Sequence, residues 1–272
     1  MRRSPILMPI IGSVLRHFSI LTLSTADEKQ YTLHMDPLKK AAIALIGLPH
    51  LGFRARARMV FDFLKGVPLD ARILDAGAGY GIYSLTLAER GYKVDVLELE
   101  AERVAALNKM KDERPVLGDR ITTTVGSLTA APMNDSSYDV IVCSDVIEHI
   151  PDDAAAVSEM ARMLVPGGLL VLTVPYDSPH NKKIYRGFGH ERPGYTEEAM
   201  RHLIAPYGLE IEKIDRYEFF FGSALFQVHN WFRSPALTAF FFYPFYFLYT
   251  IDCMLGIGSP NGIGFKIRKR SA

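Results

Sequence analysis

A run of closely spaced glycines, followed by a carboxylate, has the residue types of a cofactor site. The stretch 73–100 reads ILDAGAGYGIYSLTLAERGYKVDVLELE, and its second apolar segment ends at Glu98. Alternating apolar and turn-forming residues here predict a strand, a tight turn, a helix and a second strand. The turn carries Gly77, Gly79 and Gly81. Glycine takes positive φ and lets a ligand approach closely, and a strand-end carboxylate accepts hydrogen bonds from a ribose diol, so we expect a nucleoside-containing cofactor.

The glycine spacing narrows the choice of cofactor. The dinucleotide fingerprint is G-x-G-x-x-G, whereas this turn reads G-x-G-x-G with an acidic residue two positions before it. The turn resembles motif I of the class I S-adenosylmethionine-dependent methyltransferases, and residues 125–152 and 159–175 resemble later motifs of that family. The resemblance implies S-adenosylmethionine as the cofactor, with Glu98 on its ribose. It places beside the cofactor Asp75, Gly77, Gly79, Gly81, Glu98, Leu99, Ser127, Leu128 and Asp145. At Ser127 many members of the family carry an aspartate that binds the adenine amino group, so that contact is expected to be weaker here.

The resemblance covers about residues 55–215 and a last strand at the C-terminus, and it implies a fold. We expect an α/β protein with the Rossmann-like seven-stranded sheet of class I methyltransferases, an N-terminal helical extension, and an aromatic hydrophobic insertion before the last strand. The expected segments are a helical extension and cofactor cover at 1–66, the S-adenosylmethionine-binding core at 67–216, an aromatic membrane-association or lid segment at 217–261, and the last strand with a basic tail at 262–272.

A second group of polar residues follows the apolar run 138–144, which is expected to be a strand buried on both faces. Asp145, Glu148 and His149 share one face if the chain turns helical there, because residues three and four apart are neighbours on a helix. Two carboxylates and an imidazole so placed have the ligand types of a divalent cation site. Quinone O-methyltransferases that the stretch resembles use an acid-x-x-Glu-His run in this way, which implies Mg or Mn bound by these residues.

A metal-free alternative uses the same residues for acid–base chemistry. In it, His149 is the catalytic base, Glu148 orients it, and His190 is the second candidate for the base. Methyl transfer to a phenol or quinol needs deprotonation, to which a positioned base typically contributes about 10² to 10⁴-fold. An amine or carboxylate acceptor would need much less. His190 is equally consistent with a hydrogen-bonded structural histidine.

Composition argues against several other classes of protein. Lys plus Arg number 31 against 30 for Asp plus Glu, so the net charge of +1 gives no strong field for nucleic acid. The two cysteines provide neither a disulfide framework nor a cysteine-rich metal site. The low cysteine count fits a protein of the reducing cytoplasm.

The chain is unusually aromatic between residues 217 and 249, and residues 234–251 carry no charge. Hydropathy alone makes this segment a marginal transmembrane candidate. A single crossing would, however, leave the expected last strand at 262–270 on the wrong side of the bilayer from its sheet. A segment that enters one leaflet, flanked by Arg233 and by basic residues near the C-terminus, satisfies both constraints. The alternatives are an aromatic-lined substrate lid and a dimer interface.

These patterns together predict a cytoplasmic methyltransferase, peripheral on the membrane, that acts on a hydrophobic small molecule such as a prenylated quinone or a lipid-linked intermediate. One alternative keeps methyl transfer but acts on a soluble small molecule. Another uses the same cofactor fold for transfer of a different group to a quinone or lipid. The last is a non-catalytic protein that docks at a membrane, for which an intact glycine turn and Glu98 would have no purpose. The sequence leaves the oligomeric state open.

Overall fold

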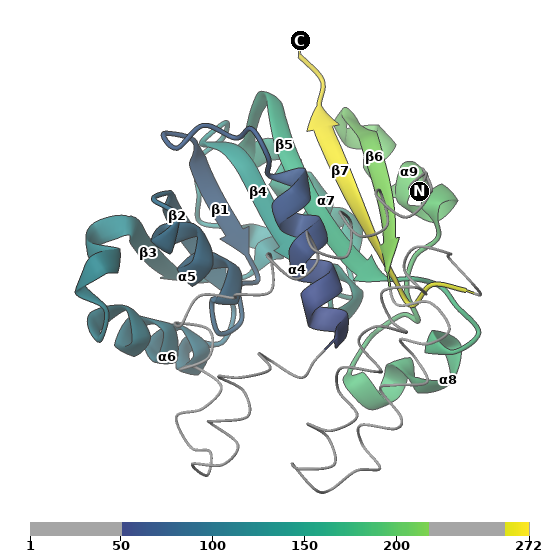
Figure 1. Cartoon of the computed structure of the whole chain (residues 1–272). Helices are drawn as coiled ribbons and strands as arrows, with labels where there is room; N and C mark the ends of the chain where they lie inside the picture. The colour runs from purple at the N-terminus through teal and green to yellow at the C-terminus, as the bar shows by residue number, and fades with distance from the viewer. Residues whose placement is uncertain (1–50, 218–258, 272) are drawn as a thin grey trace, which may run out of the picture. The chain divides into compact units, whose positions relative to one another are not determined.

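The computed structural model describes residues 51–217 and 259–271. Seven strands alternate with helices along this part of the chain, as expected of an α/β protein (Figure 1). The strands are β1 (Arg72–Ala76), β2 (Lys93–Glu98), β3 (Ile121–Val125), β4 (Tyr138–Ser144), β5 (Leu164–Pro175), β6 (Leu209–Tyr217) and β7 (Gly262–Lys269). The α-helices are α4 (Leu51–Phe63), α5 (Ile82–Glu89), α6 (Ala101–Asp112), α7 (Asp153–Met163), α8 (Asn181–Ile184) and α9 (Glu197–Ile204). Short 3-10 helices are η1 (Pro115–Arg120), η2 (Leu128–Ala130), η3 (Ile147–His149), η4 (Tyr185–Phe188) and η5 (Ala205–Tyr207).

All seven strands form one sheet, in the order β3-β2-β1-β4-β5-β7-β6. β1 to β5 are parallel to their neighbours, whereas β7 lies between β5 and β6 and is antiparallel to both. The predicted seven-stranded sheet and its last strand are therefore confirmed. Because the five parallel strands end at the same edge, the loops after β1, β2 and β4 gather there (Figure 1).

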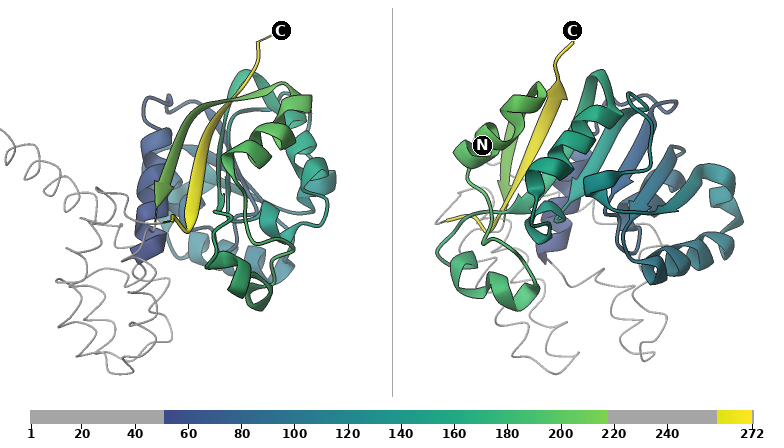
Figure 2. Two further views of the ribbon diagram at one scale, coloured as in Figure 1. Left: turned by 90° about the vertical axis from the view of Figure 1, so that its right-hand side faces the viewer. Right: turned by 180° about the vertical axis from the view of Figure 1, so that it is seen from behind.

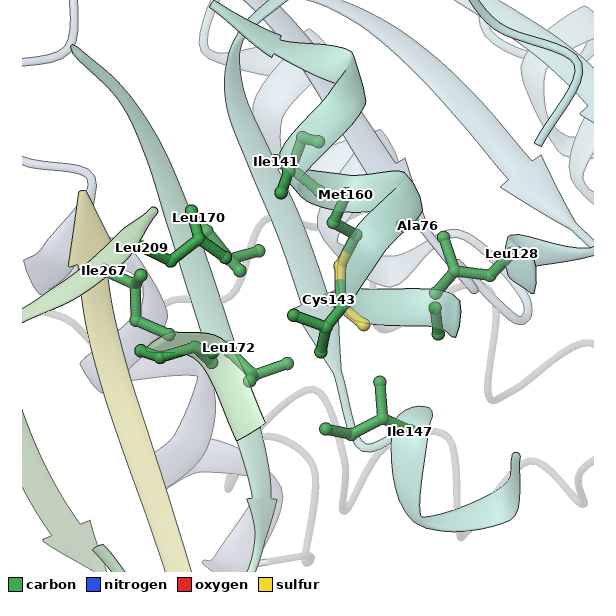
Figure 3. Packing of buried hydrophobic residues seen from close by; sticks show 14 of the residues in the cluster. Ala76, Leu128, Ile141, Cys143, Ile147, Met160, Leu170, Leu172, Leu209 and Ile267 are labelled. Carbon is green, nitrogen blue, oxygen red and sulfur yellow. The ribbon is translucent and has the colours of Figure 1, made fainter. Parts of the chain in front are cut away.

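Helices cover both faces of the sheet (Figure 2). On one face α4 packs beside α5, where the ring of Phe61 lies 6.1 Å from that of Tyr83 and the guanidinium of Arg90 lies 3.8 Å from the ring of Phe61. On the other face α7 and α9 pack over β4, β5 and β7. The side chains between α7 and the sheet form a continuous apolar core, in which Ile141, Cys143, Leu172 and Met160 are fully buried (Figure 3). Because helices cover both faces of the sheet, its central strands are nearly continuous runs of apolar residues.

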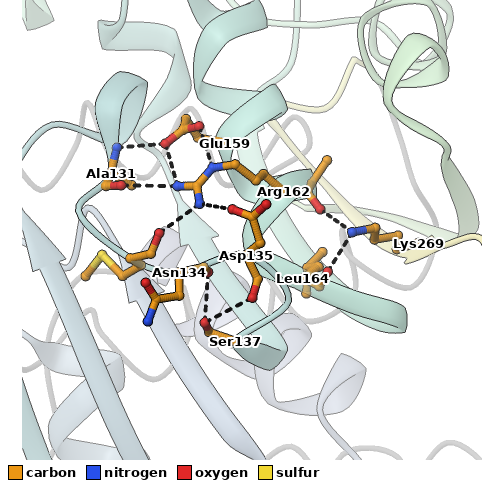
Figure 4. A network of polar contacts seen from close by, with 10 residues as sticks. Ala131, Asn134, Asp135, Ser137, Glu159, Arg162, Leu164 and Lys269 are labelled. Carbon is orange, nitrogen blue, oxygen red and sulfur yellow. Dashed lines mark hydrogen bonds and ion pairs between the residues drawn. The ribbon is translucent and has the colours of Figure 1, made fainter.

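Two cationic side chains fix the start of β5 to its surroundings (Figure 4). Arg162, near the end of α7, donates to the carbonyls of Ala131 and Met133 and to the carboxylates of Glu159 and Asp135. Lys269, at the end of β7, donates to the carbonyls of Ala161 and Leu164 over 2.7 Å each. The two bonds from Lys269 satisfy the carbonyls of Ala161, in the last turn of α7, and of Leu164, the C-cap residue of that helix.

The chain divides into two compact units, residues 1–58 with 218–258 and residues 59–217 with 259–272. Everything considered below lies in the second unit. Most of the predicted N-terminal extension and of the predicted aromatic segment at 217–261 lies outside the described residues. In the described part of the chain, no helix combines the length and the apolar character needed to cross a membrane.

Candidate active site

The glycine turn between β1 and α5 has the backbone that its sequence predicts. Gly77, Gly79 and Gly81 have φ angles of 74°, 59° and 74°, in the left-handed region that favours glycine. A Cβ at Gly77 would come within 2.5 Å of the side chain of Val146, so this glycine lets the loop after β4 pack against the loop after β1. Among the described residues, no atom lies within 4 Å of a Cβ built at Gly79. The turn is therefore packed against protein at Gly77 and open at Gly79.

Glu98 at the end of β2 holds this turn in place. The backbone N–H of Gly79 donates to Oε2 of Glu98 over 2.7 Å, and the N–H of Glu100 donates to Oε1 over 3.0 Å. The guanidinium of Arg103 lies 3.9 Å from the same carboxylate, whose residue is only 5% exposed. Each carboxylate oxygen has two lone pairs, so both retain the capacity to accept a ribose hydroxyl. The sequence pointed to the ribose contact but gave no sign of the bond to Gly79, which joins residues nineteen positions apart.

Asp75 lies below the turn in the interior. Its side chain is fully buried and accepts a short hydrogen bond from the hydroxyl of Ser84 on α5. Burial raises the pKa of Asp75 to about 6, and the bond from Ser84 partly opposes that rise. Asp75 was predicted to lie beside the cofactor, and in the structure its bond from Ser84 anchors α5 to the end of β1.

The residues predicted beside the adenine lie on the loops after β2 and β3. Leu99 follows Glu98 and is 67% exposed. Ser127 caps η2 by accepting from the N–H of Thr129, and Leu128 next to it is buried. The N–H of Gly126 donates to the carbonyl of Glu98 over 3.0 Å, which brings the two loops together.

Asp145 differs from its prediction. The chain does not turn helical at Asp145, since η3 covers only Ile147–His149 and Asp145 has a φ of 54°. Its N–H donates to the carbonyl of Thr173, and the Thr173 hydroxyl donates to its carboxylate over 3.1 Å. This left-handed residue directs Asp145 toward β5, so it does not share a face with Glu148 and His149 as the helical pattern predicted.

His190 takes the place that the sequence assigned to Asp145. One ligand atom from each of Glu148, His149 and His190 lies within 4.8 Å of the others. Glu148 is fully buried, and the two imidazole rings meet edge to face at 4.5 Å between centroids. The predicted metal set of Asp145, Glu148 and His149 is therefore corrected in its geometry, because it is His190 that lies with the other two. The three predicted catalytic residues, by contrast, do come together.

The hydrogen bonds of the two histidines define their chemistry. Nδ1 of His149 lies 3.1 Å from the carbonyl of Gly189. A carbonyl only accepts, so Nδ1 carries the proton of this bond, and Nε2 is the basic nitrogen of the neutral ring. Burial, and then the neighbouring His149, lower the pKa of His190 below its ordinary value. The His190 ring is consequently neutral at pH 7.

Arg192 holds the segment that carries His190, and no pattern in the sequence revealed this function. Its guanidinium donates to the carbonyls of Ile147 and Pro151, each over 2.9 Å, and lies 2.9 Å from the carboxylate of Asp153. The N–H of Glu191 also donates to the carbonyl of Glu148 over 2.8 Å. These bonds clamp residues 189–192 onto η3 and so set the distance between His149 and His190.

This strand order is that of the class I methyltransferase fold. The fold also has a glycine turn after β1 and a carboxylate at the end of β2, and here that carboxylate binds the turn. Residues 74–172 match the family model described as a methyltransferase domain. This match and the fold together support a class I S-adenosylmethionine-dependent methyltransferase.

Relatives and solved structures agree with that assignment. A ubiquinone biosynthesis O-methyltransferase from Xanthomonas oryzae pv. oryzae is 34% identical over 109 residues, which is 40% of this chain and 45% of that protein. The one from Xylella fastidiosa is 38% identical over 112 residues, 40% of this chain and 44% of that protein. The chain matches less than half the length of these curated relatives.

Two solved structures share the fold at low sequence identity. Geranyl diphosphate C-methyltransferase from Streptomyces coelicolor A3(2), in complex with S-adenosyl-L-homocysteine, has a TM-score of 0.60 at 16% identity, with 79% of this chain and 75% of that chain covered. Phosphoethanolamine N-methyltransferase 2 from Haemonchus contortus, in complex with S-adenosyl-L-methionine, has a TM-score of 0.61 at 18% identity, with 92% and 60% covered. Together with the family match, these complexes support S-adenosylmethionine as the cofactor.

Proposed function

We propose that this protein transfers a methyl group from S-adenosylmethionine to a hydroxyl of a hydrophobic small molecule such as a prenylated quinol. The observation that carries the proposal is that Glu148 and His149, on the loop after β4, lie close to His190 of the segment after η4, while the loop after β4 packs against the glycine turn at Gly77. The names of the curated relatives, ubiquinone biosynthesis O-methyltransferases, support a quinone-type acceptor.

In this proposal the glycine turn and Glu98 bind the cofactor. The open space at Gly79 admits the methionine end, and Glu98 accepts the ribose hydroxyls while it still holds the N–H of Gly79. Leu99, exposed at the end of β2, packs on the adenine, with Ser127 and Leu128 at its edge. Asp75 acts from below by holding α5 against the turn.

Transfer is an in-line displacement at the methyl carbon. The acceptor oxygen forms the new O–C bond as the C–S bond breaks and the sulfur keeps the electron pair. The hydroxyl proton passes to Nε2 of His149, whose Nδ1 is held by the carbonyl of Gly189. Neutral His190 adds no positive charge beside His149, and buried Glu148 stabilises the imidazolium that forms.

A divalent cation is the second candidate for the same three residues, because their ligand atoms lie close enough together to coordinate one ion. When bound, such an ion would lower the pKa of the acceptor hydroxyl. Two imidazoles and one carboxylate suit Mn better than Mg, which prefers oxygen ligands.

The direct test incubates the full chain with S-adenosylmethionine carrying a labelled methyl group and a short-chain prenylated quinol. Mass spectrometry should find the acceptor heavier by one labelled methyl group in place of hydrogen. The same quinol with its hydroxyls already methylated is the matched control and should gain nothing. Transfer of a different group, or methylation of lipid-free soluble extracts alone, would contradict the proposed reaction or the proposed acceptor.

We also propose a cytoplasmic location at the membrane surface, on the basis of the uncharged aromatic sequence 234–251, which lies outside the described residues. Apolar insertion and charge would both contribute to attachment, so high salt should release the protein only partly from anionic liposomes. Replacing Phe241, Phe245 and Phe247 by serine should release it fully. A wild-type protein that stays in solution with these liposomes would favour a substrate lid or a dimer interface instead.

A further inference from the structure

A cavity of about 280 Å³ lies at the edge of the sheet away from the glycine turn. Its wall is built where β1, β4 and β5 begin and where antiparallel β7 finishes, at the upper end of the sheet in Figure 1. Phe63 at the end of α4 forms an apolar part of the wall, and Gly167, whose carbonyl accepts from Arg268 over 3.1 Å, also lines the cavity. The cofactor loops follow the opposite ends of the same strands, so this cavity is separate from the proposed active site.

Three cations gather beside this cavity on neighbouring strands. Lys213 of β6 is the direct cross-strand partner of Lys266 of β7, and Arg268 lies two residues further along β7. Like charges directly opposite each other on an antiparallel pair are destabilising. Lys266 and Arg268 line the cavity, while Lys213 lies above the ring of Phe63, 5.3 Å from its centroid.

Among the described residues, Glu212 is the carboxylate that forms ion pairs with this group, and its partners are Arg268 and Lys266. Glu212 is the additional residue of a bulge opposite Lys266, and it forms two bonds with Arg268, of 2.9 and 3.1 Å. The Nζ of Lys266 lies 3.9 Å from this carboxylate, at the limit of an ion pair. Since Lys266 is only 25% exposed, water screens its charge less than that of a surface lysine.

The other acids near the cavity are already matched by cations. Asp139 accepts three bonds from Arg72, and this arginine lowers the pKa of the Asp139 carboxyl. Lys65 on the rim pairs with Asp62 over 2.6 Å. The positive charge of Lys213 and Lys266 is therefore left in excess after every described carboxylate at the rim is counted.

We propose that this cavity binds a phosphate group, either of a small phosphate or of a lipid phosphomonoester headgroup. A dianion bound beside Lys266 and Arg268, with Lys213 nearby, offsets the excess positive charge and weakens the repulsion between the two lysines. The volume accommodates a phosphate with a small substituent, for which Phe63 provides the apolar contact. Such a ligand would bind to the methyltransferase without competing with its cofactor or acceptor.

Thermal unfolding of the full chain in inorganic phosphate, against chloride at the same ionic strength, tests the proposal. Phosphate at about a hundredfold excess over its Kd should raise the Tm of the wild type by about 5 °C. In chloride, Lys266→Gln should melt no lower than wild type, because it relieves the repulsion from Lys213. In phosphate it should lose most of the gain, with at least a tenfold weaker Kd.

Lys93→Gln, at the exposed start of β2, is the matched control and should keep the full gain in phosphate. A second experiment distinguishes a small phosphate from a lipid headgroup. In it, the protein is sedimented with phosphatidylcholine vesicles that contain or lack phosphatidic acid. A response to inorganic phosphate, or retention by phosphatidic acid alone, supports the site if Lys266→Gln abolishes it. No response in either arm, or an equal response in Lys266→Gln, would overturn the proposal.

Discussion

Replacing Glu98 by alanine tests the link between the glycine turn and cofactor binding. In the structure this carboxylate accepts two backbone N–H groups at 2.7 and 3.0 Å, and in the proposed complex it also accepts the ribose hydroxyls. Glu98→Ala therefore removes two sets of hydrogen bonds, one present without ligand and one formed only with it. The two sets have separate consequences that can be measured separately.

The magnitudes follow from the strength of hydrogen bonds to a charged group, about 1.5 to 3 kcal/mol each. Loss of two ribose bonds at the lower value costs about 3 kcal/mol, which weakens the Kd for S-adenosylhomocysteine about a hundredfold. In the ligand-free protein, the N–H of Gly79 lies in an open turn where water replaces part of the lost bond, so we expect a cost of about 1 to 2 kcal/mol in unfolding free energy.

Calorimetric titration of S-adenosylhomocysteine measures the first effect, and urea unfolding without ligand measures the second. Glu100→Gln is the matched control, because Glu100 is an exposed neighbour whose side chain pairs with Arg103 rather than with the turn. It should bind S-adenosylhomocysteine as wild type does. If folded Glu98→Ala also binds with the wild-type Kd, Glu98 serves only to hold the turn and the proposed ribose contact is refuted.

Three further outcomes are expected. Because protonation of His190 adds a positive charge beside His149, kcat/KM should fall at acidic pH. The lowered pKa of His190 places its contribution to this fall below the ordinary pKa of histidine, and His190→Gln should shift or flatten this acid limb in a pH–rate profile. Asp75 has a pKa raised from 3.8 to about 6, so its contribution to stability is fully present below pH 4 and about 3 kcal/mol of it is lost between pH 4 and pH 6. Asp75→Asn should remove this part of the difference between urea unfolding at pH 4 and at pH 7. If Glu148 and the two histidines bind a cation, excess chelator should abolish turnover and Mn should restore it. The affinity for S-adenosylhomocysteine should stay unchanged in both conditions. Full activity in excess chelator would instead show that His149 acts as a base without a metal.

The sequence predicted the cofactor side of the fold well because its signals are local. Gly77, Gly79 and Gly81 indicate positive φ within a five-residue turn, and all three adopt it. Apolar runs bounded by turn residues indicated the parallel strands, since strands buried on both faces need nearly continuous apolar sequence. The last strand, expected at 262–270 from the family resemblance, is β7 (Gly262–Lys269).

Contacts between distant segments could not be read in the same way. His190 reaches Glu148 and His149 only because Arg192 fixes its segment to two carbonyls of the loop after β4, more than forty residues away in the chain. The lysine pair at 213 and 266 likewise depends on the register of two antiparallel strands and on a bulge between them. No periodicity within either segment encodes those pairings.

Asp145 shows why spacing alone misplaced one residue of the predicted metal set. The pattern acid-x-x-Glu-His puts three side chains on one face only if the backbone is helical from its first residue. Here β4 runs directly into Asp145, whose N–H bonds the carbonyl of Thr173 and whose carboxylate accepts from the same threonine. These two bonds extend the β4–β5 pairing by one residue and delay the helical turn to Ile147. His190 lies beside Glu148 and His149 in place of Asp145. In the described structure the residues available for proton transfer are therefore one carboxylate and two imidazoles. Imidazoles accept a proton from a hydroxyl near pH 7 more readily than carboxylates do, so this group suits that step better than two carboxylates would.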